Sequence, residues 1–355
     1  MPDYDYSLVD AAIIDTQSNT QRVLREVLAR LGMKRAETYG SVRDAADMAA
    51  AATPDLILLD IDGEEAEALR LIRRLRNEPD TRNPYACIVA TTWQPTPLLV
   101  MRVTNAGADD LLVKPVSPKQ VQERLAALIE SRKKFVVTAD YTGPDRRKSP
   151  REGAQVPLLD APNTLRLKAT NRWAHINARQ LMAEANHFVN EQKLLRISVQ
   201  VAFLIEFAAI GLTARPPERM AVEHVARVPA FLDDLLRRLD DLGEPGPAES
   251  VAKSLKMMAE RLRLHAESGA VAAEELESAR SLARDLMRAV DTARPLDAMM
   301  AEVAAAVTGY RTRLEQMAQA KAEAAKAEAA KAEAARVAVA MPAANGDAAK
   351  EAVGS

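Results

Sequence analysis

Short apolar runs alternate with amphipathic segments over the first part of the chain. Four runs, at residues 11–14, 56–59, 87–90 and 111–113, are too short for buried helices and are typical of parallel strands covered on both faces. Segments with apolar residues at helical spacing lie between or after them, at residues 20–31, 42–51, 65–76 and 97–106 and from Pro118 onwards. This alternation predicts a parallel sheet with right-handed crossovers.

Two acidic residues follow the first two runs directly. Asp15 closes the first run and Asp60 the second, and ligands bind at the carboxyl ends of the strands in open α/β sheets. Two carboxylates about 4 Å apart repel by roughly 4 kcal/mol at an effective dielectric of 20, so a neighbouring pair requires a cation or a proton. Such oxygen-rich sites suit Mg²⁺, which takes only one or two protein carboxylates. The alternative is that both acids merely cap the helices that follow.

A hydroxyl and a lysine follow the other two runs. Thr91 and Thr92 end the third, and Lys114 follows the fourth, where Pro115 stops the strand. The lysine can pair with phosphoryl oxygens, and a hydroxyl can donate a hydrogen bond to the same group. The strand ends together therefore indicate metal-assisted chemistry on a phosphoryl group.

In this order the motifs resemble the receiver domain of two-component response regulators, over about the first 135 residues. The motifs are Ile13-Ile14-Asp15, Leu58-Leu59-Asp60, Ala90-Thr91-Thr92, Gly107-Ala108-Asp109-Asp110 and Val113-Lys114-Pro115. The resemblance implies a flavodoxin-like fold, and transfer of a phosphoryl group to Asp60 from a histidine kinase or phosphotransfer protein. It also implies that Asp15 helps to hold Mg²⁺ and that Lys114 contacts the phosphoryl group. Thr92 would shift toward that group on activation; it fits the family spacing, and Thr91 is the alternative.

Several residues depart from the family pattern. Thr16 stands where the family has a second acid, and Asp62 is our candidate to replace it, which makes Asp15, Asp60 and Asp62 the predicted metal ligands. Trp93 occupies the place of a small residue, and Leu111 stands where an aromatic switch residue is common. The loop at residues 63–65 lacks the usual proline. These changes bear on Mg²⁺ affinity and on switching.

Composition narrows the class of protein. The chain has 355 residues and a formal net charge of −2, which gives no electrostatic reason to expect general nucleic-acid binding. We see no helix-turn-helix with a basic recognition helix, so DNA binding is not expected. The single cysteine, Cys87, excludes an internal disulfide and suits a reducing cytoplasm. The acidic N-terminus shows no apolar signal region, and we expect a cytoplasmic protein.

Residues 135–170 read as a basic linker that contains Pro and Gly. The density of glycine, proline and charge at residues 141–151 favours a solvated linker after a short possible strand at 135–138. Arg147 and Arg151 have the spacing of the arginine pair in cyclic-dinucleotide-binding PilZ domains, but the companion motif of those domains is absent from the sequence.

Residues 171–300 are expected to form an α-helical bundle. Two apolar stripes run along residues 173–212, and Arg196, Gln200 and Glu206 interrupt them, which favours a bundle core over a membrane span. Further helices are predicted at 216–242, kinked at Pro229, at 248–267, at 272–292 and from Pro295. The four histidines lack the neighbours of a phosphotransfer site and the spacing of a metal cluster, so we read them as surface or packing residues.

Residues 301–355 are predicted to be an extended Ala/Glu/Lys helix and a disordered tail. The sequence Lys-Ala-Glu-Ala-Ala occurs three times in succession at 321–335. Alanine has the highest helix propensity, and glutamate and lysine three apart support a helix that needs no tertiary contacts. We expect the helix to fade near Met341 and Pro342. A spacer that ends in a loose tail suggests tethering, with a coiled coil as one possible form, and the alternative is an uncapped helix with no partner.

The sequence therefore predicts a response regulator that is not an enzyme, apart from loss of its own phosphoryl group. Its receiver would occupy residues 1–134, and the state of Asp60 would be relayed to a helical region with an unknown protein partner and a possible homodimer. The alternative is a phosphorylation-independent, receiver-like scaffold that dimerises or docks partners through its helical half.

Overall fold

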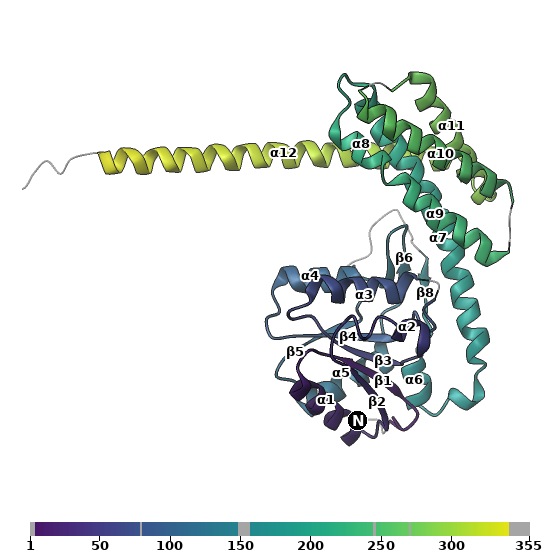
Figure 1. Ribbon diagram of the computed structural model, residues 1–355, viewed down its shortest axis with the longest axis vertical. Coiled ribbons are helices and arrows are strands. Elements are labelled where there is room, and N and C mark those ends of the chain that lie inside the picture. The colour runs from purple at the N-terminus through teal and green to yellow at the C-terminus, as the bar shows by residue number, and fades with distance from the viewer. Residues whose placement is uncertain (1–3, 79, 148–156, 244–245, 270, 341–355) are drawn as a thin grey trace, which may run out of the picture.

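The N-terminal domain is a five-stranded parallel sheet with helices on both faces (Figure 1). The computed structural model describes residues 4–78, 80–147, 157–243, 246–269 and 271–340. The sheet order is β2-β1-β3-β4-β5, the flavodoxin-like order. Its elements are β1 (Asp10–Ile14), α1 (Ser18–Arg30), β2 (Arg35–Tyr39), α2 (Met48–Ala51), β3 (Leu56–Asp60), α3 (Glu65–Asn77), β4 (Cys87–Thr92), α4 (Pro97–Ala106), β5 (Asp110–Val113) and α5 (Pro118–Ser131).

Alternate side chains of the central strands pack into two hydrophobic cores, one on each face of the sheet. Ile13, Leu58 and Val89 pack with residues of α1 and α5 on one face. Ile57 and Ile88 pack with residues of α3 and α4 on the other. Because both faces are covered, the central strands are apolar without alternation, and the predicted parallel sheet is confirmed.

Two local predictions differ from the structure. The edge strand β2 was not predicted, because its sequence Arg-Ala-Glu-Thr-Tyr lies partly exposed at the border of the sheet and has no apolar run. The helix predicted at 42–51 is only the short α2, since residues 41–47 form turns. Neither difference moves the carboxyl ends of β1, β3, β4 and β5.

The segment predicted as a solvated linker at residues 135–170 is instead folded over its described residues. β6 (Phe135–Val137) pairs antiparallel with β7 (Thr142–Pro144) and β8 (Leu158–Leu159), and α6 (Thr164–Ala169) follows. Leu165 and Ala169 of α6 join the core beneath α1 and α5. The linker prediction is corrected because apolar and charged groups here find partners far away in sequence. Arg147 pairs with Asp145, and Arg151 lies outside the described residues.

One buried acid between two arginines fastens β6 to the sheet. Asp109 accepts hydrogen bonds from Arg76 Nη2 at 2.8 Å and from Arg132 Nε at 2.7 Å. Both guanidinium groups lie over the Phe135 ring, 5.1 Å and 4.9 Å from its centroid. Burial alone would raise the pKa of Asp109, but the charges of Arg132 and Arg76 lower it below its usual value. We call Arg76, Asp109 and Arg132 the Asp109 cluster.

A lysine and two acids fasten α6 to the opposite end of β1 and β3. Lys168 Nζ donates to Asp10 Oδ2 at 2.8 Å and to Asp55 Oδ2 at 2.7 Å, and lies 5.1 Å from the Trp173 ring centroid. Burial raises the pKa of Asp55, against the hydrogen bonds that it accepts. We call Asp10, Asp55 and Lys168 the basal clasp.

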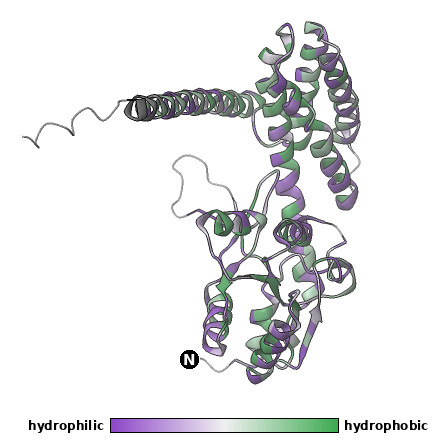
Figure 2. Ribbon diagram, turned by 60° about the vertical axis from the view of Figure 1, so that its left-hand side comes forward, coloured by the Kyte–Doolittle hydropathy of each residue, from purple (hydrophilic) through white to green (hydrophobic). Residues whose placement is uncertain are grey.

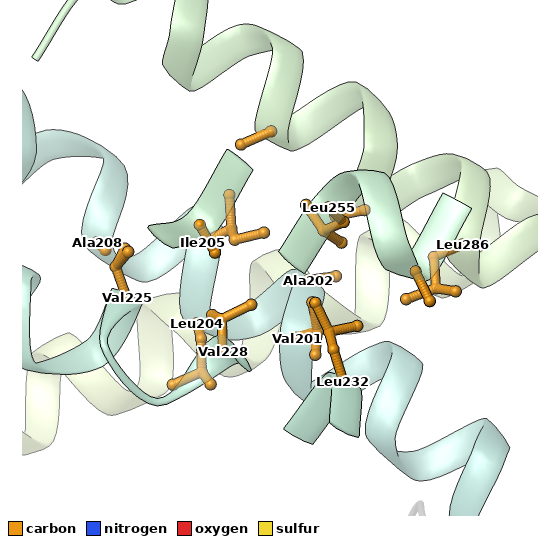
Figure 3. Close-up of a cluster of buried hydrophobic side chains, with 14 of the residues drawn as sticks. Val201, Ala202, Leu204, Ile205, Ala208, Val225, Val228, Leu232, Leu255 and Leu286 are labelled. Carbon is orange, nitrogen blue, oxygen red and sulfur yellow. The ribbon is translucent and has the colours of Figure 1, made fainter. Parts of the chain in front are cut away.

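The second half of the chain is an α-helical bundle built around one long helix. After a short 3₁₀ turn, η1 (Trp173–His175), the chain enters α7 (Ala178–Thr213) and then α8 (Arg219–Val225), α9 (Val228–Leu242), α10 (Pro247–Glu267) and α11 (Ala273–Val290). Side chains of α7 such as Leu204 and Ile205 are fully buried against Val228, Leu232 and Leu255 (Figure 3). The predicted kink at Pro229 is wrong, because Pro229 lies in the first turn of α9, where its missing N–H costs nothing.

The central helix α7 is long and apolar enough to cross a membrane by length and composition alone. Its most apolar window has a mean hydropathy of 1.8, and 61% of that window is buried inside the protein. Burial of this kind is what the core helix of a bundle requires.

The last helix, α12 (Leu296–Ala340), leaves the bundle and projects away from it (Figure 1). Met299 and Val303 in its first turns are buried in the bundle core. Every side chain at residues 315–332 is exposed, and hydrophilic and hydrophobic residues alternate along this part (Figure 2). The predicted extended helix is confirmed to residue 340, and the predicted tail lies outside the described residues.

Candidate functional site

Strand register brings the predicted residues to one rim of the sheet. Ile14 of β1 is paired with Leu59 of β3, Asp60 with Thr91 of β4, and Thr92 with Val113 of β5. Asp15 directly follows β1 and lies level with Asp60, and Lys114 directly follows β5, two residues beyond Leu112, which is level with Asp60. Residues that are level in neighbouring parallel strands share a face, and so do residues two apart along one strand, so Asp15, Asp60 and Lys114 lie on the same face at this rim.

Lys114 bridges the two acids in this pocket. Its Nζ donates to Asp15 Oδ2 at 2.9 Å and to Asp60 Oδ1 at 2.6 Å, and all three side chains are buried. Burial acts to lower the pKa of Lys114, but its hydrogen bonds to Asp60 and Asp15 outweigh burial and raise that pKa. The lysine therefore carries a positive charge that balances part of the repulsion between the acids.

Asp60 has one oxygen committed to the protein. Its Oδ1 accepts from Lys114 Nζ and from the backbone N–H of Asp62 at 3.2 Å, whereas Oδ2 accepts no hydrogen bond from the described residues. Burial raises the pKa of Asp60, the hydrogen bond from Lys114 opposes this, and the charge of Asp15 adds to the rise. Asp60 is only 6% exposed, so the site is nearly closed to solvent. Because Oδ2 accepts no hydrogen bond from the described residues, this oxygen remains available for chemistry.

Asp62 is drawn away from the pocket by the end of β4. Its Oδ1 accepts from Thr92 Oγ1 at 2.7 Å, and its Oδ2 accepts from the Trp93 N–H at 2.8 Å. The distance from Asp62 Oδ2 to Lys114 Nζ is 3.9 Å. Thr91 Oγ1 is buried and has no hydrogen-bond partner among the described residues. Thr92 is thus held by Asp62 and contacts Asp60 through no hydrogen bond.

Trp93, which occupies the place of a small residue, lies beside Lys114 at the edge of the pocket. Its ring centroid is 5.9 Å from Lys114 Nζ, and 47% of the residue is exposed. A cation over an indole face is attracted by the ring quadrupole, so Trp93 both covers and stabilises the lysine.

The structure brings together three of the five predicted site residues, Asp15, Asp60 and Lys114. The other two, Asp62 and Thr92, form a neighbouring pair. Within the described ranges no group of three or more histidine, cysteine or acidic side chains is arranged to hold a metal ion. The three predicted carboxylates are therefore not gathered in one site here, because Asp62 uses both oxygens elsewhere, and the metal ligands stay a prediction.

Sequence reasoning missed the basal clasp and the Asp109 cluster. The sequence held one signal for the clasp: the apolar runs of β1 and β3 are each preceded as well as followed by an acid, so a second pair of acids is expected at the opposite rim of the sheet. Its lysine lies 158 residues from Asp10, so no local pattern could identify the partner.

Comparison with known proteins assigns the first domain. Residues 11–126 match the family model described as the response regulator receiver domain. The N-terminal domain is a receiver domain. The chain also carries a helical half to which this family match does not extend.

Two curated relatives illustrate the extent of the similarity. The receiver is 29% identical over 126 residues to the cyclic di-GMP phosphodiesterase response regulator RpfG of Xanthomonas campestris, covering 35% of this chain and 32% of that protein. It is 25% identical over 113 residues to the chemotaxis protein CheY of Thermotoga maritima, covering 32% of this chain and 91% of CheY. The chain thus spans about a third of the first relative's length, and only the receiver is shared.

Solved receiver structures resemble the same domain. A response regulator from Thermotoga maritima is 25% identical with a TM-score of 0.31, covering 35% of this chain and 100% of that one. The chemotaxis protein CheY4 of Vibrio cholerae is 20% identical with a TM-score of 0.31, covering 33% of this chain and 96% of that one.

Proposed function

We propose that the receiver accepts a phosphoryl group on Asp60 from a histidine kinase or phosphotransfer protein, and that the resulting state alters the helical half. The observation that supports this most is the bridge from Lys114 to Asp15 and Asp60 at the strand ends. No further catalysis is proposed beyond loss of the phosphoryl group to water.

Asp60 would act as the nucleophile. Its Oδ2 attacks phosphorus, the bond from phosphorus to the donor nitrogen breaks, and the donor imidazole keeps that electron pair and takes a proton. A phosphoryl group adds roughly −1.5 to −2 charge at neutral pH, by analogy with other phosphorylated side chains. Lys114 lies 2.6 Å from Asp60 Oδ1, so it can neutralise part of this charge.

Thr92 connects the phosphorylation pocket to Asp62 and to the residues before α4. To donate a hydrogen bond to a phosphoryl oxygen, Thr92 Oγ1 would have to leave Asp62 Oδ1, its acceptor at 2.7 Å. Asp62 also accepts from the Trp93 N–H, so release of Thr92 changes the residues that precede α4. This would be the first step by which the state of Asp60 alters a surface.

The pocket fits Mg²⁺ as a two-carboxylate site. Asp15 and Asp60 would hold the ion, and Asp62 would not unless it released Thr92 and Trp93. Mg²⁺ is commonly bound by one or two carboxylates together with phosphate oxygens, and it would supply positive charge to the transferring group. With Thr16 in place of a second neighbouring acid, we expect weak binding before phosphorylation.

Trp93 should report Mg²⁺ directly. In a Trp173→Phe background, Mg²⁺ is expected to change Trp93 emission because it competes with Lys114 for the acids beneath the ring. The change should be lost in Asp15→Asn. Emission that responds equally in the Asp15→Asn protein would show that Mg²⁺ acts elsewhere.

The decisive test is covalent labelling of the full chain by a small phosphodonor such as acetyl phosphate with Mg²⁺. Wild type should be labelled with an acid-stable, base-labile bond, and Asp60→Asn should lose the label completely. Asp55→Asn is the matched control, because Asp55 directly precedes the strand that Asp60 ends and also pairs with a lysine, but in the basal clasp. Labelling of Asp60→Asn at the wild-type level would refute the assignment.

The alternative function is a scaffold that does not accept phosphate. Lys114 already satisfies both acids, Trp93 covers it, and one family carboxylate is missing, all of which favour this reading. The helical half would then dimerise or dock a partner whatever the state of Asp60. Absence of label on wild type with Mg²⁺, and an unchanged molecular mass after donor treatment, would favour the scaffold.

A further inference from the structure

A cavity of about 290 Å³ lies between the receiver and the helical bundle, and none of the rim-pocket residues lines it. It is lined from α3 and β7 on the receiver side and from α7 and α9 on the bundle side. The lining residues that matter here are Asn77, Thr142, Asn186, Asn190, Arg237 and Arg238. At about 30 Å³ per water, the junction cavity has room for several waters or one small molecule.

Three polar atoms of this lining are buried without a hydrogen-bond partner among the described residues. They are Asn77 Oδ1, Thr142 Oγ1 and Arg238 Nε. Arg238 Nε forms an ion pair with Asp234 Oδ1 at 3.1 Å, but the geometry of this contact is not that of a hydrogen bond. Thr142 is 3% exposed and Arg238 is 4% exposed. A buried polar group left unpaired costs about 1–3 kcal/mol, so Asn77 Oδ1 and Thr142 Oγ1, together with the incompletely satisfied Arg238 Nε, point to a missing occupant of the cavity.

Two asparagines of α7 have amide groups that are half used. Asn186 Oδ1 accepts from Tyr85 Oη at 2.8 Å, and Asn190 Oδ1 accepts from Arg238 Nη1 at 2.7 Å. With both carbonyl oxygens engaged, each Nδ2 remains a donor. The lining thus offers the donors Arg238 Nε, Asn186 Nδ2 and Asn190 Nδ2, the acceptor Asn77 Oδ1, and a hydroxyl that can serve as either.

Buried charge around the junction cavity is mostly positive. Arg76, which lines it, shares a single acid with Arg132 in the Asp109 cluster. Lys193 is 2% exposed beside Arg238 and donates only to the Ala139 carbonyl, at 3.3 Å. Burial, and then the charge of Arg238, lower the pKa of Lys193 to about 8. Glu78 and Asp241 also line the cavity, and Arg237 pairs with Asp241 and with Asp234. These acids, like Asp140, are partly or fully exposed, so water screens them.

We propose that the junction cavity binds a small oxyanion that also carries a hydroxyl proton, with the chemistry of hydrogen phosphate or a hydroxy acid. Its oxygens would accept from Arg238, from the Thr142 hydroxyl and from the two amide nitrogens, and its O–H would donate to Asn77 Oδ1. Both domains contribute, so the bound anion would hold the receiver against α7 and α9. The site is separate from the rim pocket and does not depend on phosphorylation of Asp60.

The test uses the full chain and inorganic phosphate as the probe, with sulfate as an anion that lacks a hydroxyl proton at neutral pH. Calorimetry should detect saturable phosphate binding to wild type, weaker sulfate binding, and unchanged phosphate binding to Asp60→Asn. Arg238→Gln and Thr142→Val should each weaken phosphate binding by about tenfold or more, as expected for loss of one hydrogen bond to an anion. Arg288→Gln is the control, since Arg288 is exposed and contacts Asp285 on its own helix.

Thr142→Val keeps the test valid if Arg238→Gln fails to fold. Valine has nearly the same shape as threonine and removes a hydroxyl that is unpaired without a ligand. The free energy of unfolding should therefore stay the same or rise slightly. A water-filled cavity would give no phosphate binding to wild type, which overturns the proposal. Phosphate binding that Arg238→Gln and Thr142→Val leave unchanged, or sulfate binding as tight as phosphate, would overturn it as well.

Discussion

Asp109→Asn is expected to lower the free energy of unfolding by about 4 kcal/mol, because it leaves two buried arginines without an anion. Asp109 also accepts from the Ile88 N–H at 2.8 Å, so one side chain joins α3, β4 and the residue that follows α5. An asparagine has the same shape, but it loses the charge and turns an N–H₂ group toward a guanidinium. Urea unfolding measured by circular dichroism should show the lower midpoint.

Asp110→Asn provides the control for Asp109. Asp110 is the next residue and pairs with Arg124 at 3.2 Å, but its side chain is 27% exposed. Exposed pairs contribute roughly 0–1 kcal/mol, so its loss should be small. Equal destabilisation by the two variants would show that the buried cluster is not what fastens β6 to the receiver.

Lys193→Met is expected to raise the free energy of unfolding by about 2 kcal/mol at neutral pH. The pKa of Lys193 falls from 10.5 to about 8 in the folded protein, chiefly because of burial. A depressed lysine pKa means that the folded state binds its proton more weakly, so protonated Lys193 destabilises the fold below about pH 8. Methionine fills a similar volume and removes that charge, at the loss of one hydrogen bond to the Ala139 carbonyl.

The pH dependence identifies the cause. Wild-type stability should gain a contribution from Lys193 as the pH rises from about 8 to 10.5, where the unfolded chain still holds the proton that the folded protein has lost. The advantage of Lys193→Met should shrink over the same range. Lys256→Met, at an exposed lysine paired with Asp233, should show no such trend. A constant advantage of Lys193→Met at every pH would mean that packing, and not charge, explains it.

The sheet and the pocket could be predicted because their signals are local. Central strands such as β3 are buried on both faces, so their apolar runs stand out, and an acid or lysine that ends such a strand must reach the same rim. Edge strand β2 has no such run, because it is half exposed.

The rest depended on contacts that no local pattern carries. Asp62 was assigned to the metal site because it lies two residues from Asp60, but its side chain is set by Thr92 and Trp93 on another strand. The packing of α6, at the end of the predicted linker, likewise rests on Lys168 reaching Asp10 and Asp55, more than a hundred residues away. Gly143 and Pro144, which favoured a linker in the sequence, lie in strand β7 instead.

The length of the projecting part of α12 sets both the distance of its far end from the bundle and the direction that this end faces around the helix axis. Residues 315–340 extend about 40 Å from the bundle at about 1.5 Å per residue. Removal of one five-residue repeat would shorten this arm by about 7.5 Å and turn everything beyond it by about 140° around the axis. Any group carried at its far end therefore faces a direction set by the number of repeats, and two repeats removed together change that direction differently from one.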